Sequence, residues 1–207
     1  MKVFPTVLSA ALILTGCQSP QNKPAPGSQG AQSTRNNSYS LLHQLLDEQK
    51  NVSLLRFIKR EDSDVKLLIK KIASDSRSGA KLLERFAKED PTLSLADIGL
   101  PPGEVATREA IASTKKKELL GKTGEAFEFS LLLTQTEALR YGSHLAKVAS
   151  ENEPQPDRSR ALTDMNIEME KLYGQVLEML VLKTRSSTNR VAEANPEPER
   201  HTRSHRF

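Results

Sequence analysis

The stretch that decides the fold of this chain is LTDMNIEMEKLYGQVLEM, residues 162–179. Its apolar side chains recur three and four residues apart, at Leu162, Met165, Met169, Leu172, Val176 and Met179. This spacing gathers them on one stripe of a helix, and such a stripe is stable only when it packs against other helices. The methionines could suggest copper, which soft thioethers bind, but at this spacing they are typical of core packing.

Outward from this stretch, the pattern predicts three more long helices, over residues 40–60, 62–89 and 125–152, and a short one over 104–120. Proline, which cannot continue a helix, follows two of them: Pro91, Pro101 and Pro102 come after residues 62–89, and Pro154 and Pro156 after residues 125–152. The short helix is interrupted at Gly121-Lys-Thr-Gly124. The last helix is expected to begin at Asp157 or Ser159. No stretch alternates as a strand would. The fold class predicted is all-α, a four-helix bundle with a short extra helix before the third long one.

Each long helix carries a stripe of expected core residues. The helix over 40–60, which Ser40 can cap, is expected to bury Leu41, Leu45, Val52 and Leu55. The helix over 62–89 is expected to bury Val65, Leu68, Ile72, Gly79, Leu82 and Phe86. The helix over 125–152 is expected to bury Phe127, Leu131, Thr134, Ala138, Tyr141, Leu145 and Val148.

The N-terminus predicts where the protein resides. Lys2 precedes a short apolar stretch that ends in Leu14-Thr-Gly-Cys17, and Cys17 is the only cysteine of the chain. The stretch is too short to span a bilayer and suits a signal peptide. Small residues before a cysteine are what lipoprotein processing requires. Residues 1–16 are therefore predicted to be a lipoprotein signal peptide, with lipid on Cys17. Gln18 replaces the Asp that would resemble an inner-membrane retention signal, so the outer membrane, facing the periplasm, is expected in a Gram-negative cell.

Composition divides the remaining chain into a domain and two tails. Residues 17–38 are polar and rich in Pro, Gly and Ser, and are predicted to form a disordered tether. Residues 39–183 form the predicted bundle domain, and residues 184–207 a disordered, basic tail. The net charge of +4 is mild and dispersed, so no nucleic-acid partner is expected. Without a second cysteine, no disulfide can stabilise the domain.

The chain also resembles a known family. The run LLGKTGEAFEFSLLL, residues 119–133, is followed by Ala138 to Ala149 with its histidine and preceded by Leu100-Pro-Pro102. These segments resemble the third helix, and the loop before it, of a bacterial envelope family catalogued as domain of unknown function 4142. The resemblance covers Leu41 to Leu182. It implies a ferritin-like four-helix bundle and an envelope location, and the family has no settled activity to transfer.

A ferritin-like bundle raises the question of a metal site. Di-iron bundles use Glu residues and Glu-x-x-His pairs that point inward, and no Glu-x-x-His occurs here. Weak metal candidates on the expected inner faces are Asp75, Glu137, His144 and Glu170, with Glu48 on the first helix. The favoured alternative to a metal is that these carboxylates form salt bridges or lie in solvent. A buried Arg140, whose guanidinium would pair with them, is a special case of this alternative. No cofactor is therefore expected.

The motifs of common enzyme classes are absent from the sequence. There is no Gly-x-Ser-x-Gly, no P-loop and no Gly-x-Gly-x-x-Gly. The sequence therefore favours a non-enzymatic, lipid-anchored protein that acts through contacts with envelope proteins or the cell wall, with no small-molecule substrate indicated. One alternative is a metal-binding or stress-protective bundle, and another is a ligand carrier that uses a cavity in the bundle.

Overall fold

The computed structural model describes residues 29–53, 62–96 and 99–194, with side chains described up to residue 186. The described chain is all-α and contains no strand. Its helices are α1 (Gln29–Gln49), α2 (Ser63–Glu89), α3 (Pro102–Gly121), α4 (Gly124–Asn152) and α5 (Pro156–Ala194). None of them combines the length and the apolar character that crossing a membrane would require.

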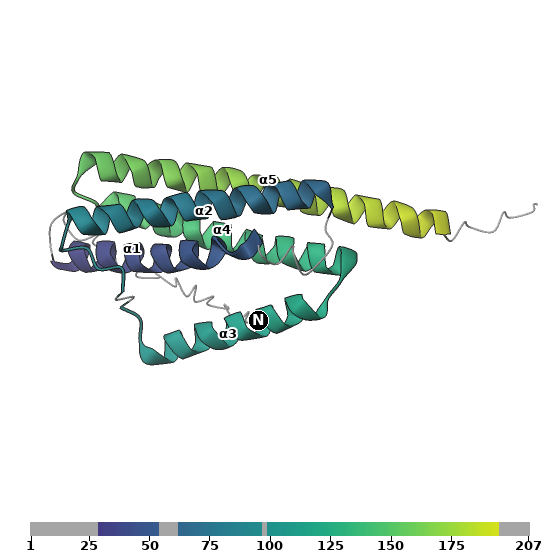
Figure 1. The fold of residues 1–207 in the computed structure, drawn as a ribbon, viewed down its shortest axis with the longest axis horizontal. Coiled ribbons are helices and arrows are strands. Elements are labelled where there is room, and N and C mark those ends of the chain that lie inside the picture. The colour runs from purple at the N-terminus through teal and green to yellow at the C-terminus, as the bar shows by residue number, and fades with distance from the viewer. Residues whose placement is uncertain (1–28, 54–61, 97–98, 195–207) are drawn as a thin grey trace, which may run out of the picture.

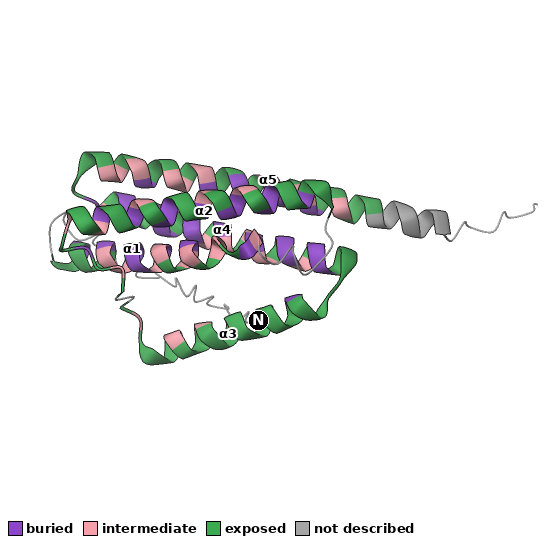
Figure 2. Cartoon of the chain, in the orientation of Figure 1, coloured by how far each residue is buried: buried purple, intermediate pink, exposed green. Residues whose placement is uncertain are grey.

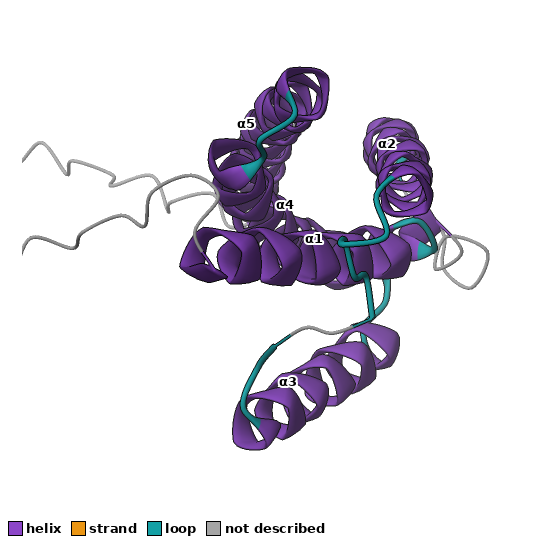
Figure 3. Ribbon diagram, turned by 90° about the vertical axis from the view of Figure 1, so that its left-hand side faces the viewer, coloured by secondary structure: helices purple, strands orange, loops and turns teal. Residues whose placement is uncertain are grey.

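Four of the helices pack against one another, and α3 lies apart (Figure 1). α4 and α5 form a tight hairpin, α1 packs against α4, and α2 packs mainly against α1. The view from the end shows α3 as a separate helix beside the α1 side of this assembly (Figure 3). Most of its surface is exposed, and Leu119 is its one buried residue (Figure 2). The core therefore belongs to α1, α2, α4 and α5.

The predicted boundaries of α2, α3 and α4 and the start of α5 are confirmed within a few residues. The cap predicted at Ser40 is wrong, because Ser40 lies inside α1. The side chain of Asp62 caps α2 by accepting a hydrogen bond from the backbone N–H of Asp64 at 3.0 Å. The same helix ends at Glu89, just before Pro91. Prolines also bound the turn between α4 and α5, where Asn152 ends one helix and Pro156 begins the next.

The predicted seam of α5 is confirmed. Leu162, Met169, Leu172 and Val176 are buried, and Met165 and Met179 pack against the core. The predicted stripe of α2 is confirmed too, with Leu82 partly buried and the others buried.

Two predicted faces are partly wrong. On α1, Leu42 and Leu46 are buried, whereas the predicted Leu41 and Leu45 are half-buried. On α4, Phe127, Leu131 and Leu145 are buried as predicted. Thr134, Ala138 and Tyr141 are only half-buried, and Val148 is exposed. Runs of consecutive leucines, such as residues 131–133, fit two neighbouring stripes equally well, so spacing alone does not choose between them.

The predicted tails are shorter than expected where the structure describes them. α1 begins at Gln29, so residues 29–38 of the predicted tether are helical. Arg35 there is 5% exposed, and polar contacts rather than an apolar stripe hold it, which the composition could not indicate. α5 continues to Ala194 and includes the first part of the predicted C-terminal tail.

Several predictions fall outside the described residues. These are the signal peptide, Cys17, the tether up to residue 28, Leu55 and the tail from residue 195. The first long helix, predicted to reach Arg60, ends at Gln49 as α1, and a short 3₁₀ turn follows at residues 52–53.

Gly174 of α5 offers a simple test of the described packing. A Cβ atom at this exposed position would have no heavy atom within 4 Å. Glycine weakens a helix interior by about 0.5–1 kcal/mol relative to alanine. Gly174→Ala should therefore raise the free energy of unfolding by about 0.5–1 kcal/mol in urea denaturation.

Gly142 of α4 is the matched control. A Cβ atom there would lie 2.8 Å from Cδ2 of Leu45 and 2.9 Å from Sδ of Met169. Gly142→Ala should lower stability by about 1 kcal/mol, because overpacking outweighs the gain in helix propensity. If Gly174→Ala were the destabilising change of the two, the described exposure of this α5 face would be incorrect.

Candidate functional site

A cavity of the described residues lies between α3 and the helices α1 and α4. Its volume is about 790 Å³, within the range of small-molecule sites. We call it the α3 cavity. Its apolar lining residues are Leu45, Val52, Ile111, Ala112, Leu119, Leu120, Leu131, Ala138 and Tyr141. Its polar lining residues are Glu48, Gln49, Asn51, Glu104, Arg108, Lys115, Lys116, Thr134, Gln135 and Glu137.

Polar side chains hold α3 over this cavity. Arg108 donates a hydrogen bond from Nη1 to the hydroxyl oxygen of Tyr141 at 2.9 Å, and its guanidinium lies 5.2 Å from the centre of that ring. Lys115 forms an ion pair with Glu137 of α4. Exposed contacts of this kind contribute little stability each. With one buried residue on α3, they make it the least buried of the described helices.

The charge of Arg108 is secured by its neighbours. Hydrogen bonds from Arg108 to Glu104 and to Tyr141 raise the pKa of the guanidinium, with Glu104 the larger cause. The guanidinium therefore donates hydrogen bonds to a carboxylate and to a phenol.

Two of the residues that line the α3 cavity carry a buried amide oxygen without a described partner. The Oε1 atoms of Gln49, at the end of α1, and of Gln135, in the middle of α4, are buried and accept no hydrogen bond from any described residue. Gln135 as a whole is 1% exposed. Leaving a buried acceptor without a partner costs about 1–3 kcal/mol. Because both oxygens are closed off from solvent, they lie within the packing behind the cavity wall rather than on its surface.

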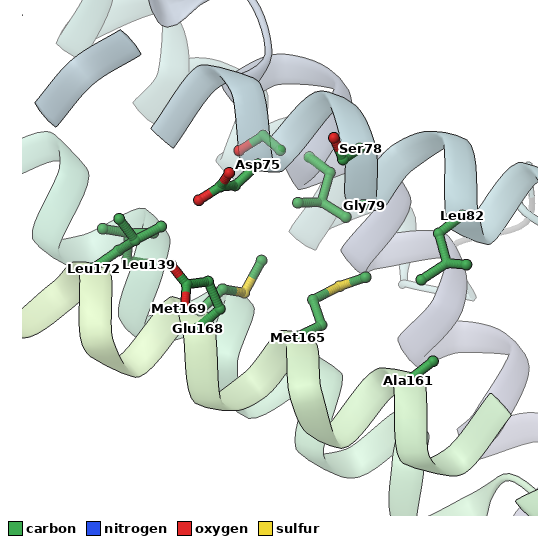
Figure 4. Close-up of a pocket in the computed structure, with 12 residues that line it drawn as sticks. Asp75, Ser78, Gly79, Leu82, Leu139, Ala161, Met165, Glu168, Met169 and Leu172 are labelled. Atoms are coloured by element: carbon green, nitrogen blue, oxygen red, sulfur yellow. The ribbon is translucent and has the colours of Figure 1, made fainter. Parts of the chain in front are cut away.

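A second, smaller pocket lies between α2 and α5, with a volume of about 250 Å³. Figure 4 shows Asp75 of α2 and Glu168 of α5 on either side of it. Lys71 donates hydrogen bonds to both carboxylates, at 2.7 and 2.6 Å. These contacts raise the pKa of Lys71, Asp75 being the larger cause, and Lys71 in turn lowers the pKa of Glu168. The charges at this pocket are thus already paired.

The predicted metal candidates do not converge. Asp75 is paired with Lys71, whereas Glu137 is exposed on α4 and pairs with α3. His144 and Glu170 are both exposed. Within the described ranges, no group of three or more His, Cys, Asp or Glu side chains is placed to hold a metal ion.

The predicted buried Arg140 is wrong. Arg140 is exposed, and its guanidinium lies 5.4 Å from the ring centre of Tyr173 on α5. The α4 face that turns into the core carries Leu139 and Gly142 instead. Glu48, expected on the inner face of α1, is exposed and accepts a hydrogen bond from Gln44.

The sequence reasoning missed both glutamines. Gln135 had a usable signal, because it continues the four-residue spacing of Phe127, Leu131 and Leu139, all buried. One polar residue within such an apolar series is a candidate for a buried functional group. Gln49 had no comparable signal, since it lies at the end of α1 among polar residues.

Comparisons with protein-family models, with curated proteins and with solved structures find no match for this chain. The functional argument therefore rests on the geometry of the α3 cavity and on the sequence features described above.

Proposed function

We propose that this protein is a lipid-anchored binding protein of the bacterial cell envelope, which holds a small molecule in the α3 cavity without transforming it. The anchor is the lipid on Cys17, and the domain is a ferritin-like four-helix bundle of the envelope family that the sequence resembles. The α3 cavity is the observation that carries the binding role. It is large and apolar, and a weakly attached helix covers it.

The paired state of the other charged groups supports binding rather than catalysis. The cavity's Arg108, Lys115 and Glu137 are engaged in contacts that hold α3 in place. Asp75 and Glu168 at the smaller pocket share Lys71, and Glu168 also lies 3.8 Å from Nζ of Lys171. A general acid or base works best when its pKa is tuned near the operating pH. Pairing instead raises the pKa of Arg108 and of Lys71 and lowers the pKa of Glu168, which favours their charged forms.

Native mass spectrometry of the processed, full-length protein tests the proposal. The probe is N-phenyl-1-naphthylamine, a neutral aromatic amine, and the spectrum should show one molecule bound per chain. The variant Ala112→Trp places a large ring in the cavity lining. It should weaken binding about tenfold or more, which corresponds to about 1.4 kcal/mol.

Ala110→Trp is the matched control, because Ala110 is an exposed alanine of the same helix that does not line the cavity. It should leave the affinity unchanged. An absence of binding, or equal weakening in both variants, would refute the proposal and favour action through contacts with envelope proteins or the cell wall.

A further inference from the structure

We infer that the exposed face of α5 pairs with the same face of a second copy of this chain, with the two α5 helices antiparallel. Such an interface has two-fold symmetry, so each copy contributes the same residues. It lies away from the α3 cavity, whose described lining includes no residue of α5. The inference is therefore independent of the proposed function.

The first observation is an apolar series on α5 that the packing of the described helices leaves uncovered. Ile167 is 57% exposed, Leu177 40% and Val181 48%. Together with the exposed Gly174 they recur seven, three and four residues apart, which aligns them along one stripe of the helix. Figure 3 shows no described helix on the outer side of α5. A stripe at this spacing is typical of a helix that packs against another helix.

The second observation is a notch in the middle of this stripe. A Cβ atom on Gly174 would have no heavy atom within 4 Å, so the space above the helix backbone is open there. In an antiparallel pair centred on this notch, Leu177 of each copy lies opposite Gly174 of the other. Glycine allows a close approach to the backbone, so the leucine side chain can enter the notch as a knob enters a hole.

The third observation is a row of charges along one edge of the stripe. Four exposed side chains follow one another at intervals of seven residues and alternate in sign; they are Asp164, Lys171, Glu178 and Arg185. In the antiparallel pair centred on the notch, Lys171 of one copy lies opposite Glu178 of the other. The same register places Asp164 opposite Arg185, and the two-fold symmetry forms each pair twice. Of the four, Lys171 alone has an ion pair among the described residues, a 3.8 Å contact with Glu168.

The parallel orientation would lose these pairs. In a parallel pair of helices, one edge of the seam faces the opposite edge of the partner's seam. On α5 the opposite edge consists of uncharged residues, namely Asn166, Tyr173 and Leu180. Complementary charges determine orientation and register more than they determine affinity. The row of alternating charges therefore favours the antiparallel orientation.

The same outer face continues onto α4. Phe129 and Leu133 are 41% and 43% exposed and share a stripe of α4 with Arg140, whose guanidinium lies over a ring of α5. The ion pair between Glu128 and Lys183 places this part of α4 beside the C-terminal part of the α5 stripe. A partner helix on α5 therefore meets further apolar surface at this end of the seam.

Two polar residues limit the length of the seam. Glu170 and Thr184 fall on the same stripe as Ile167 and Leu177, and both are exposed. The continuous apolar part is therefore short, and obligate dimers bury larger and more hydrophobic interfaces. We expect a dimer that forms and dissociates with protein concentration.

Sedimentation equilibrium of the processed, full-length protein, in a density-matched detergent between about 1 and 100 μM, measures this association. Lys171→Glu should weaken the dimer about tenfold, because it places two carboxylates opposite each other twice per dimer. Adding Glu178→Lys to Lys171→Glu reverses both members of each pair and should restore the wild-type affinity. Lys81→Glu, the same charge change at an exposed position of α2, is the matched control and should leave the dimer unchanged.

Gly174→Leu supplies a second readout, because it fills the notch. The dimer should weaken at least tenfold, while the single chain should be as stable as the wild type or more so, since leucine favours a helix more than glycine and the position is open. Urea denaturation at a concentration where the monomer predominates shows that the variant folds. The gain expected for Gly174→Ala applies to the same monomeric condition.

A protein that stays monomeric over this concentration range would overturn the inference. A dimer that Lys171→Glu and Gly174→Leu leave intact would overturn it too, because its interface would lie elsewhere on the molecule. If the double reversal does not restore association, the antiparallel register is wrong. Binding of N-phenyl-1-naphthylamine should be the same in Lys171→Glu as in the wild type, so the dimer and the function of the α3 cavity are tested separately.

Discussion

Replacing Glu153 by alanine should lower the free energy of unfolding by about 3 kcal/mol, near the lower limit for breaking a buried ion pair. The Glu153 side chain is 0% exposed and follows α4. Its Oε2 accepts a hydrogen bond from the Tyr39 hydroxyl at 2.7 Å, and its Oε1 accepts one from Nε of Arg158 at 3.1 Å. Alanine would leave both donors buried with one partner fewer. Arg158 would retain Asp90, at 2.9 Å, which keeps the loss from being larger.

This network joins the packed helices at one of their ends. Asp90, just after α2, also lies 3.7 Å from Arg35 of α1. Tyr39 and Arg35 of α1, Asp90 after α2, Glu153 after α4 and Arg158 of α5 thus join all four packed helices. Two arginines balance two carboxylates, so the network is neutral as a whole. Removing one member breaks that balance in a place that is largely shielded from water.

Urea denaturation at pH 7 measures the effect. Glu170→Ala is the matched control, because Glu170 is an exposed glutamate of α5, and its loss should change the free energy of unfolding by less than about 0.5 kcal/mol. Tyr39→Phe should give an intermediate loss of about 1–2 kcal/mol, since it removes one donor and no charge. Equal stability of Glu153→Ala and Glu170→Ala would show that the network is not formed.

The same network predicts how stability depends on pH. Hydrogen bonds from Thr92, together with Arg158, lower the pKa of Asp90 from its ordinary 3.8. A lowered pKa means that this contribution is complete above pH 3.8 and is lost as the pH falls through the depressed value. Burial, and the hydrogen bond to Glu153, raise the pKa of Tyr39 above its ordinary 10.0. Its contribution is complete below pH 10.0 and declines as the pH rises beyond it.

The contrast between α5 and α1 shows what the sequence alone could predict. The seam of α5 was readable because apolar side chains at a regular spacing determine both the helix and its buried face. The start of α1 was not, because residues 29–38 are polar and their burial depends on partners distant in sequence. Arg35 donates a hydrogen bond to Thr92 at 2.9 Å, across 57 residues of chain. A local pattern does not contain information about such a contact.

The candidate site shows the same limit. Sequence reasoning looked for charged residues on inner faces and selected Asp75, Glu137, His144 and Glu170, which the structure places on different surfaces. The α3 cavity exists because α3 stands away from the other helices, held by Leu119 and a few polar contacts. Only the position of Gln135 in an apolar series was visible beforehand. Its partner residue in the cavity, Gln49, required the fold.

Replacing Cys17 by serine should release the protein from the membrane or leave it unprocessed. Serine lacks the thiol to which the diacylglyceryl group is attached, so no lipid is added. Each buried methylene contributes about 0.8 kcal/mol, so the two or more acyl chains of the proposed anchor would make membrane attachment nearly permanent. Membrane fractionation, with the mass of the processed N-terminus, should show wild-type protein in the membrane pellet and Cys17→Ser absent from it or uncleaved.

Gln18→Asp is the matched control for this change, because it keeps Cys17 and its lipid. In a Gram-negative cell the variant should stay membrane-bound and move towards the inner membrane. Unchanged processing and fractionation of Cys17→Ser would refute lipidation at this residue.

The released protein should still bind N-phenyl-1-naphthylamine, because residues 45–141 contain the whole described lining of the α3 cavity. If Cys17→Ser leaves the membrane and still binds the probe, then membrane attachment depends on Cys17 and ligand binding does not.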